Sequence, residues 1–220
     1  MYEKEVLSHV LQRESLVVQA LDVLRQAILT HQIPPGSPIN IRHVARQLGV
    51  SPIPIREALR RLEAEGLLVF ADKRIVVTKL SRAELEDIYS IRIPLENLVV
   101  KKIFSSGVPP DLSRLEDLHQ KMCQPEVTGA EWFALNRLFH MELHSLAQSP
   151  RLFSILQGLW NSTGPYLRIF SEDKKAVKRA NEEHQKIIEG LTRGDRGLVC
   201  STLTRHLRNG LRVLRRLVPE

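Results

Sequence analysis

The chain has 220 residues, of which 43% are apolar, and it carries 32 Lys and Arg against 25 Asp and Glu. This composition accommodates two domains with buried cores, and the net charge of +7 favours a polyanionic partner. No apolar run approaches the roughly 18 residues of a membrane span and residues 1–10 lack a signal-peptide pattern, so we expect a cytoplasmic protein that contacts no membrane.

A helix is expected near the start of the chain, after a flexible lead-in over residues 1–14. Apolar residues recur there at helical spacing, namely Val17, Leu21, Leu24 and Ile28. The turn at Pro34-Pro35-Gly36 follows this helix and separates it from the two short helices further along the chain. We expect this helix to pack beneath the two that follow.

Two short amphipathic helices joined by a tight turn come next. Asn40 is a suitable N-cap for the first helix, and Gly49 suits a left-handed C-cap. The apolar stripe of this helix consists of Ile41, Val44, Ala45 and Leu48. Ser51 is the N-cap of the second helix, and Pro52 occupies its first position, where the missing N–H costs no helical bond.

The second helix has one predicted buried face and one predicted exposed face. The residues expected in the core are Ile55, Ala58, Leu59 and Leu62. The residues that project roughly opposite are Ile53, Arg56, Glu57 and Arg60. The basic side chains therefore point away from the core, and Gly66 ends the helix.

Two apolar runs, Leu67–Phe70 and Ile75–Thr78, are typical of a hairpin whose turn carries Lys73 and Arg74. Two helices followed by such a hairpin form a winged helix-turn-helix. This arrangement places the second helix in the major groove of DNA and the cationic hairpin tip near phosphates. A small helical domain with a solvated basic face is the alternative that periodicity and caps alone leave open.

The residue identities favour DNA binding. The stretch LGVSPIPIREALRRLEAEGL from Leu48 to Leu67 closely resembles the recognition region of GntR-family transcription regulators, as does Ile33-Pro34-Pro35-Gly36 upstream. The positions that match family DNA contacts are Arg42, Ser51, Ile53, Arg56 and Lys73. The resemblance therefore implies double-stranded operator DNA as the partner.

The chain departs from the family pattern directly after the cap. Pro52 stands where the family usually has a second Arg, and Ile53 stands where Thr is frequent. A lost bidentate guanidinium removes a guanine contact worth about 1–3 kcal/mol of discrimination. We therefore expect an operator that differs from those of other members.

From Ser81 onward the pattern predicts about six helices and no sheet. Capping boxes occur at Ser81-Arg82-Ala83-Glu84 and at Thr128-Gly129-Ala130-Glu131. Further helix starts are expected at Asp111, Ser149-Pro150, Ser171-Glu172-Asp173 and Gly194-Asp195. The fold is thus mainly α, with a winged helix-turn-helix domain over residues 15–79 and an all-helical domain over residues 80–220.

Four residues of the helical half can converge on a metal. Asn136 and His140 lie one turn apart on one helix face, and His184 and His206 lie near the middle of two later helices. Imidazoles from three helices suit zinc or nickel and leave coordination positions open. The alternative is that these are ordinary hydrogen-bonded core histidines, since the chain has eight histidines.

The helical half resembles the FCD effector domain of the FadR (fatty-acid regulator) subgroup of the GntR family. The matching segments are Asn136–His140, Glu183–Ile188 with Gly194-Asp195, and His206-Leu207. Members with a metal site use an Asp and three His at these places, whereas here Asn136 replaces the Asp and weakens the affinity expected for a dication. His144 is either a spare ligand or a residue that packs or reaches solvent, and Glu183 is expected to be a surface charge.

A bound metal would give a carboxylate effector an anchoring point. Arg92 matches an Arg common in the first helix of the family's effector domain and is the first candidate for binding that carboxylate. Tyr166 and Arg168 are further candidates, and ordinary packing and salt bridging are the alternative for all three.

These features predict a ligand-responsive transcription regulator, and the family favours a repressor relieved by a small organic acid. A homodimer would place two recognition helices about 34 Å apart on a near-palindromic operator. Two alternatives stay open at this point. One is a metal-dependent hydrolase of the helical-bundle class, although no general base or nucleophile motif is present, and the other is a non-specific nucleic-acid-binding protein.

Overall fold

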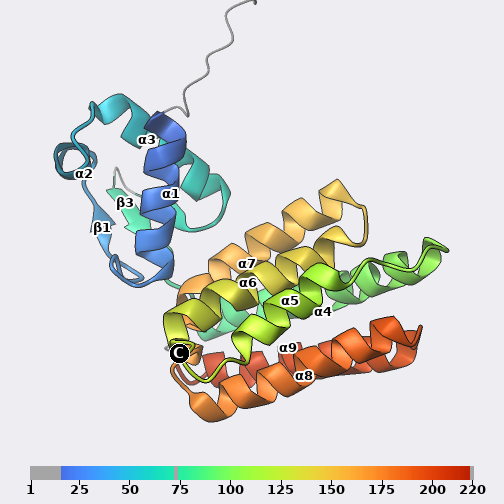
Figure 1. The fold of residues 1–220 in the computed structure, drawn as a ribbon. Helices are drawn as coiled ribbons and strands as arrows, with labels where there is room; N and C mark the ends of the chain where they lie inside the picture. Colours follow the sequence, from blue (N-terminus) through green and yellow to red (C-terminus); the bar gives the residue numbers. More distant parts are fainter. Residues whose placement is uncertain (1–15, 72–73, 219–220) are drawn as a thin grey trace, which may run out of the picture.

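The computed structural model describes residues 16–71 and 74–218 (Figure 1). The lead-in expected over residues 1–14 and the wing residue Lys73 lie outside the described residues. The N-terminal unit consists of α1 (Leu16–Leu29), β1 (Pro38–Ile39), α2 (Ile41–Gln47), α3 (Pro52–Ala64), β2 (Leu68–Ala71) and β3 (Arg74–Val77). The helical unit consists of α4 (Arg82–Ser105), α5 (Ser113–Met122), α6 (Gly129–Ser145), α7 (Pro150–Phe170), α8 (Lys174–Thr192) and α9 (Arg196–Leu214).

Local sequence signals account for the start and end of the two short helices. The Asn40 side chain accepts a hydrogen bond from the backbone N–H of His43, as an N-cap does. α3 begins at Pro52 directly after Ser51. Gly49 and Gly66 both have positive φ, which a residue without Cβ adopts at little cost after a helix. Leu48 is the C-cap and is half-exposed, so it does not complete the predicted apolar stripe.

The buried face of α3 is the one that the sequence predicts. Its core residues Ile55, Ala58, Leu59 and Leu62 are fully buried. They pack against α1 and α2, which is the arrangement expected of a helix-turn-helix core.

The wing is a three-stranded antiparallel sheet in the order β1-β3-β2. Leu68 pairs with Val77 and Ala71 with Arg74, so each strand is shifted by one residue from its predicted range. β1 was not predicted, because a strand of two residues carries no periodicity and forms only through its pairing with Ile75 and Val76.

The six helices of the helical unit agree with the prediction, and residues 80–218 contain no strand, as expected. Both capping boxes are formed: Ser81 with Glu84 and Thr128 with Glu131 exchange side-chain and backbone hydrogen bonds in both directions. Among the described residues, no helix is both long and apolar enough to cross a membrane.

Figure 1 shows the N-terminal unit at one side of the helical unit, facing α6 and α7, with α8 and α9 on the far side. α1 contacts α7 directly. The connection between the units is also held in place, since the backbone N–H of Leu80 donates to the Tyr166 hydroxyl at 2.9 Å. The two units are therefore packed together rather than joined only by a chain segment.

Candidate functional site

The first candidate site is the exposed face of α3 and its surroundings. The Ile53 side chain is 75% exposed, and Arg56 and Arg60 are exposed at helical spacing on the same side of α3. Ser51, Arg42 and Arg74 are exposed as well. The arginines of α3 are thus free of the hydrophobic core, as DNA binding requires. Which of these residues touch DNA stays a prediction.

The second candidate site is a cavity inside the helical unit with a volume of about 30 Å³, which is room for one or two water molecules. Its walls come from α4, α6, α7, α8 and α9. The lining residues used below are Arg92, Trp132, Asn136, His140, Trp160, Glu183 and His206.

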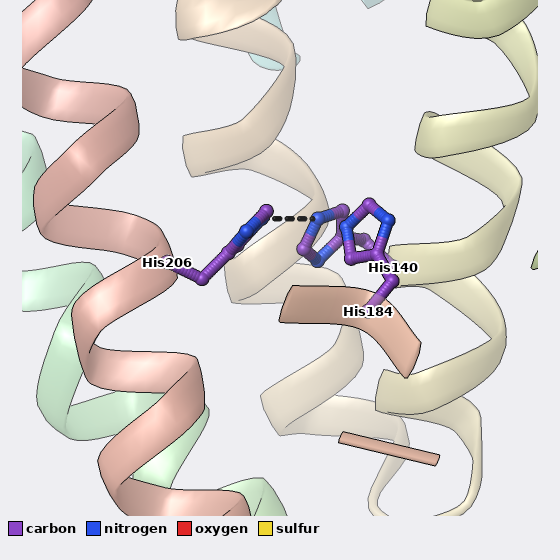
Figure 2. Close-up of side chains that lie close together, drawn as sticks. All are labelled: His140, His184 and His206. Atoms are coloured by element: carbon purple, nitrogen blue, oxygen red, sulfur yellow. Dashed lines mark hydrogen bonds between the residues drawn. The ribbon is translucent and has the colours of Figure 1, made fainter. Parts of the chain in front are cut away.

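Three histidines from three helices meet beside this cavity (Figure 2). His140 Nε2 lies 3.3 Å from His206 Nε2, and the ring of His184 lies 4.7 Å from that of His206 between centroids. One ligand nitrogen from each of the three residues lies within 4.8 Å of the others. Two nitrogens bound tetrahedrally to zinc at about 2.0–2.1 Å are about 3.3 Å apart, so the His140–His206 separation matches that of a ligand pair.

Glu183 holds the ring of His206 in an orientation suitable for a metal ligand. Its Oε2 accepts a hydrogen bond from His206 Nδ1 at 3.0 Å, because a carboxylate only accepts. The proton is then on Nδ1, and the lone pair of Nε2 faces His140. A carboxylate behind a histidine is the usual support of a metal ligand.

The expectation that Glu183 is a surface charge was wrong. The residue is 6% exposed and also accepts a hydrogen bond from Asn209 Nδ2 at 2.6 Å. Burial alone would raise its pKa, but the hydrogen bonds from His206 and Asn209 and nearby positive charge outweigh burial and lower it. α9 packs against this side of α8 and supplies both donors, which the helix of Glu183 alone does not reveal.

Several buried polar atoms around the cavity have no hydrogen-bond partner among the described residues. These atoms are Asn136 Oδ1, His140 Nδ1, and both ring nitrogens of His184. Buried polar atoms in folded proteins are nearly always paired, so unpaired atoms gathered at one place fit an ion, water or ligand that would pair with them. The amide oxygen and the imidazole nitrogens are suitable donors for zinc or nickel, and Asn136 lies where the sequence placed it.

A second buried cluster adjoins the first. Arg92 Nε donates to Glu96 Oε1 at 2.6 Å, and both side chains are almost fully buried. His144 Nε2 lies 3.3 Å from Glu96 Oε2, so His144 is a buried packing residue rather than a solvent-exposed one. Glu96, His140 and His144 together have ligand atoms within 4.8 Å of one another. The sequence reasoning missed Glu96, and its spacing of four residues from Arg92 was the available signal.

Burial would raise the pKa of Glu96, but the charge of Arg92 and the contact with His144 hold it well below its usual range. Glu96 therefore stays ionised and neutralises Arg92. The Nε–H of the guanidinium is used in this ion pair, and Arg92 also lines the cavity.

Tyr166 and Arg168 are not brought to the cavity. The Tyr166 hydroxyl accepts from Leu80 at the junction of the two units, and Arg168 pairs with Glu172 and Ser171 near the end of α7. Neither residue lines the cavity wall. An effector contact of these two residues therefore does not fit this cavity, because the helix face that carries them points toward other elements.

The buried imidazoles should make the free energy of unfolding depend on pH. The pKa values of His140 and His184 lie well below the usual value, mainly because burial disfavours the charged ring. Protons therefore bind more readily to the unfolded chain once the pH falls below about 6.5. In the presence of chelator, the free energy of unfolding should fall between about pH 6.5 and about pH 5.5, by up to roughly 1.4 kcal/mol per pH unit for each histidine.

Denaturant unfolding at several pH values measures this effect. His184→Gln should reduce the dependence of the free energy of unfolding on pH, whereas replacement of the exposed His43 by Gln should leave this dependence unchanged. A free energy of unfolding that does not vary over this pH range would contradict the assignment of both rings as neutral.

An exposed basic helix with a wing, packed against a helical unit that encloses a cavity beside three histidines, is the arrangement of a DNA-binding transcription regulator. Residues 16–76 match the family model described as bacterial regulatory proteins, gntR family, and residues 87–209 match the FCD domain. The chain belongs to the GntR family of transcription regulators, in the FadR subgroup whose members carry an FCD domain.

Named relatives agree with this membership. The chain is 31% identical to the HTH-type transcriptional regulator YdhC of Bacillus subtilis over 76% of this chain and 84% of that protein. It is 24% identical to the gluconate operon transcriptional repressor of the same species over 88% of this chain and 82% of the repressor.

A solved structure of McbR/YncC from Escherichia coli superimposes with a TM-score of 0.80 at 26% identity, covering 93% of this chain and 99% of that one. These relatives are transcription regulators and not enzymes, so the hydrolase alternative is set aside.

Proposed function

We propose that the chain is a homodimeric repressor whose affinity for its operator is changed by a small organic acid bound in the cavity. Residues 15–79 would form the DNA-binding domain and residues 80–220 the effector and dimerisation domain. The proposal rests mainly on one observation, the convergence of His140, His184 and His206 beside the buried Arg92.

In this proposal the three histidines and Asn136 hold a zinc or nickel ion. The ion would supply a Lewis-acidic anchor for a carboxylate. The four ligands are neutral and Glu96 already neutralises Arg92, so Glu183, the carboxylate behind His206, would offset only part of a dication's charge. An anionic ligand is the species that such a site favours. The substitution of Asn for Asp thus weakens metal binding but increases the attraction for a carboxylate.

The cavity volume supports a link between ligand binding and a change of shape. A volume of about 30 Å³ is too small for an organic acid, so the walls must move apart when one enters. Trp160 of α7 is part of that wall, and α7 also contacts the N-terminal unit. Displacement of α7 would therefore alter the position of α3. The name of the gluconate operon repressor supports repression by analogy.

The experiment begins with selection of a binding site from random duplexes. A specific regulator should prefer the selected duplex over random duplex by roughly 10³-fold or more at about 150 mM salt. The reason is that contacts to the bases add binding free energy to that of the phosphate contacts, which any duplex provides. Zinc-loaded protein is then titrated with the selected duplex in the presence of mono-, di- and tricarboxylates. At least one carboxylate should change the operator affinity. Equal affinity for selected and random duplex would instead identify a non-specific nucleic-acid-binding protein.

A further inference from the structure

α7 presents two different faces to two different parts of the protein. Trp160, Leu167 and Phe170 face the cavity. Asn161, Gly164 and Pro165 meet the N-terminal unit instead. The carbonyl oxygen of Pro165 lies within hydrogen-bond distance of His31 Nε2, and the other two contacts are described below. One helix thus forms both part of the cavity wall and the surface against which the N-terminal unit packs.

The two units approach each other very closely along this helix. A Cβ added at Gly66 would lie 2.6 Å from Ser162 Oγ, and one added at Gly164 would lie 2.6 Å from Leu29 Cδ2. Gly66 directly follows the end of the recognition helix α3. Because Ser162 lies directly against Gly66, and Leu29 against Gly164, a shift of α7 can reach the end of α3 by direct contact.

A chain of polar contacts crosses the same interface. Asn161 Nδ2 donates to Glu65 Oε2 at 3.3 Å, and Glu65 is the C-cap of α3. Arg25 of α1 binds both oxygens of Glu65, at 2.9 and 2.6 Å, and so fixes the carboxylate. Asn161 itself is 2% exposed, so its amide has few alternatives to these partners.

The chain of contacts continues to the helix that carries the cavity ligands. Arg137 Nη2 donates to Asn161 Oδ1 at 3.5 Å, and its guanidinium lies 5.6 Å from the ring centroid of Trp160. Arg137 follows Asn136 directly in sequence and precedes His140 by three residues. A movement of α6 that accompanies occupation of the cavity would carry Arg137 with it.

We propose that Arg137, Asn161 and Glu65 form a relay of positioning residues that couples the cavity to the recognition helix. This inference rests on the proposed function in one respect, the identity of the ligand that occupies the cavity. The contacts of the relay, however, exist without any ligand, so they can be tested without one. In this state they hold the end of α3 against α7. A displacement of α6 or α7 by a ligand would break the Asn161–Glu65 contact and release the N-terminal unit.

The first test uses hydrogen exchange on the full chain without metal. Asn161→Ala should accelerate amide exchange about fivefold in residues 25–31 and 60–66, the factor that corresponds to about 1 kcal/mol. Exchange in α4, α5, α8 and α9 should not change. Asn97→Ala is the matched control, because it removes an Asn hydrogen bond to Thr204 inside the helical unit. Arg137→Met removes the guanidinium but keeps bulk beside Trp160, and it serves if Asn161→Ala fails to fold.

A double variant separates a relay from unrelated structural effects. Arg137 makes its hydrogen bond toward α3 through Asn161, and its charge also acts directly on Glu65. In a relay the hydrogen bond dominates, so Asn161→Ala/Arg137→Met should exchange in residues 60–66 at nearly the rate of Asn161→Ala alone. If the acceleration factors of the two single variants multiply in the double variant, the two residues act independently and the relay is overturned. The relay would also be overturned if Asn161→Ala exchanged within twofold of wild type in residues 25–31 and 60–66. It would be overturned as well if the acceleration in Asn161→Ala extended equally through the helical unit.

The second test adds zinc. Zinc should protect α6, α8 and α9 in wild type and in Asn161→Ala, and should change exchange in residues 60–66 only in wild type. Protection of the cavity helices with no response in residues 60–66 of wild type would overturn the relay while leaving the metal site intact. If zinc protects none of these helices, the proposed metal site fails, and the zinc-free comparison still decides on the relay.

Discussion

Replacing Arg56 and Arg60 together by alanine should weaken binding to the selected operator by about 30-fold or more. Each arginine that contacts a base or phosphate is worth about 1–3 kcal/mol, and even the lower value for both gives roughly this factor. Both side chains are exposed on α3, so their loss should leave the free energy of unfolding nearly unchanged. Quantitative duplex-retention assays at fixed salt measure the effect.

A matched control removes the same charge elsewhere. Arg114→Ala/Arg151→Ala takes two exposed arginines from the helical unit and lowers the net charge equally. If affinity depended only on net charge, both double variants would lose it to the same extent. Retention of operator binding by Arg56→Ala/Arg60→Ala would mean that α3 is not the recognition helix.

Replacing His140 by alanine should abolish metal binding and remove the stabilisation that the metal provides. Ligand binding to the folded state contributes about 4.1 kcal/mol when free zinc is about 1,000 times its Kd. For a chain of this size that corresponds to roughly 8–16 °C in Tm. Zinc-treated wild type should therefore lose stability on addition of chelator, whereas His140→Ala should not respond.

Elemental analysis of the dialysed proteins gives the metal content independently of stability. His43→Ala removes an exposed histidine of the N-terminal unit and should keep the metal content of wild type. Wild type that retains no metal after zinc treatment, with a Tm unaffected by chelator, would rule out the proposed site. In that case the three histidines would be core residues.

Features that depend on neighbouring residues in sequence could be predicted, because caps and apolar spacing act within one or two turns. Asn40, Ser81 and Thr128 thus marked helix starts close to their positions in the structure. The convergence of Asn136, His140 and His206 around one cavity also agrees with the prediction, although their ligand roles still await a test.

Features that depend on a partner from another element could not be predicted in this way. Glu183 is buried because α9 brings His206 and Asn209 to it, and Glu96 is buried because His144 of α6 lies beside it. The same holds for Tyr166, whose hydroxyl accepts from the segment that joins the two units. A single helix indicates how its residues are spaced but not which charges its neighbours supply.

These corrections bear on mechanism. Tyr166, Asn161 and Pro165 of α7 all contact the N-terminal unit or the segment that leads from it, and Trp160 of the same helix lines the cavity. In our proposal, α7 is therefore the element through which a change in the cavity reaches α3. A free energy of coupling of about 1–3 kcal/mol between two sites corresponds to a change in affinity of roughly 5–150-fold.

Measurement of zinc affinity with and without the selected operator duplex tests most directly whether cavity and DNA surface are coupled. Our account predicts that operator DNA changes the Kd for zinc by about fivefold or more, and that zinc changes the Kd for operator by the same factor, as linkage requires. If the protein binds both zinc and operator but neither alters the affinity for the other, the cavity does not control DNA binding.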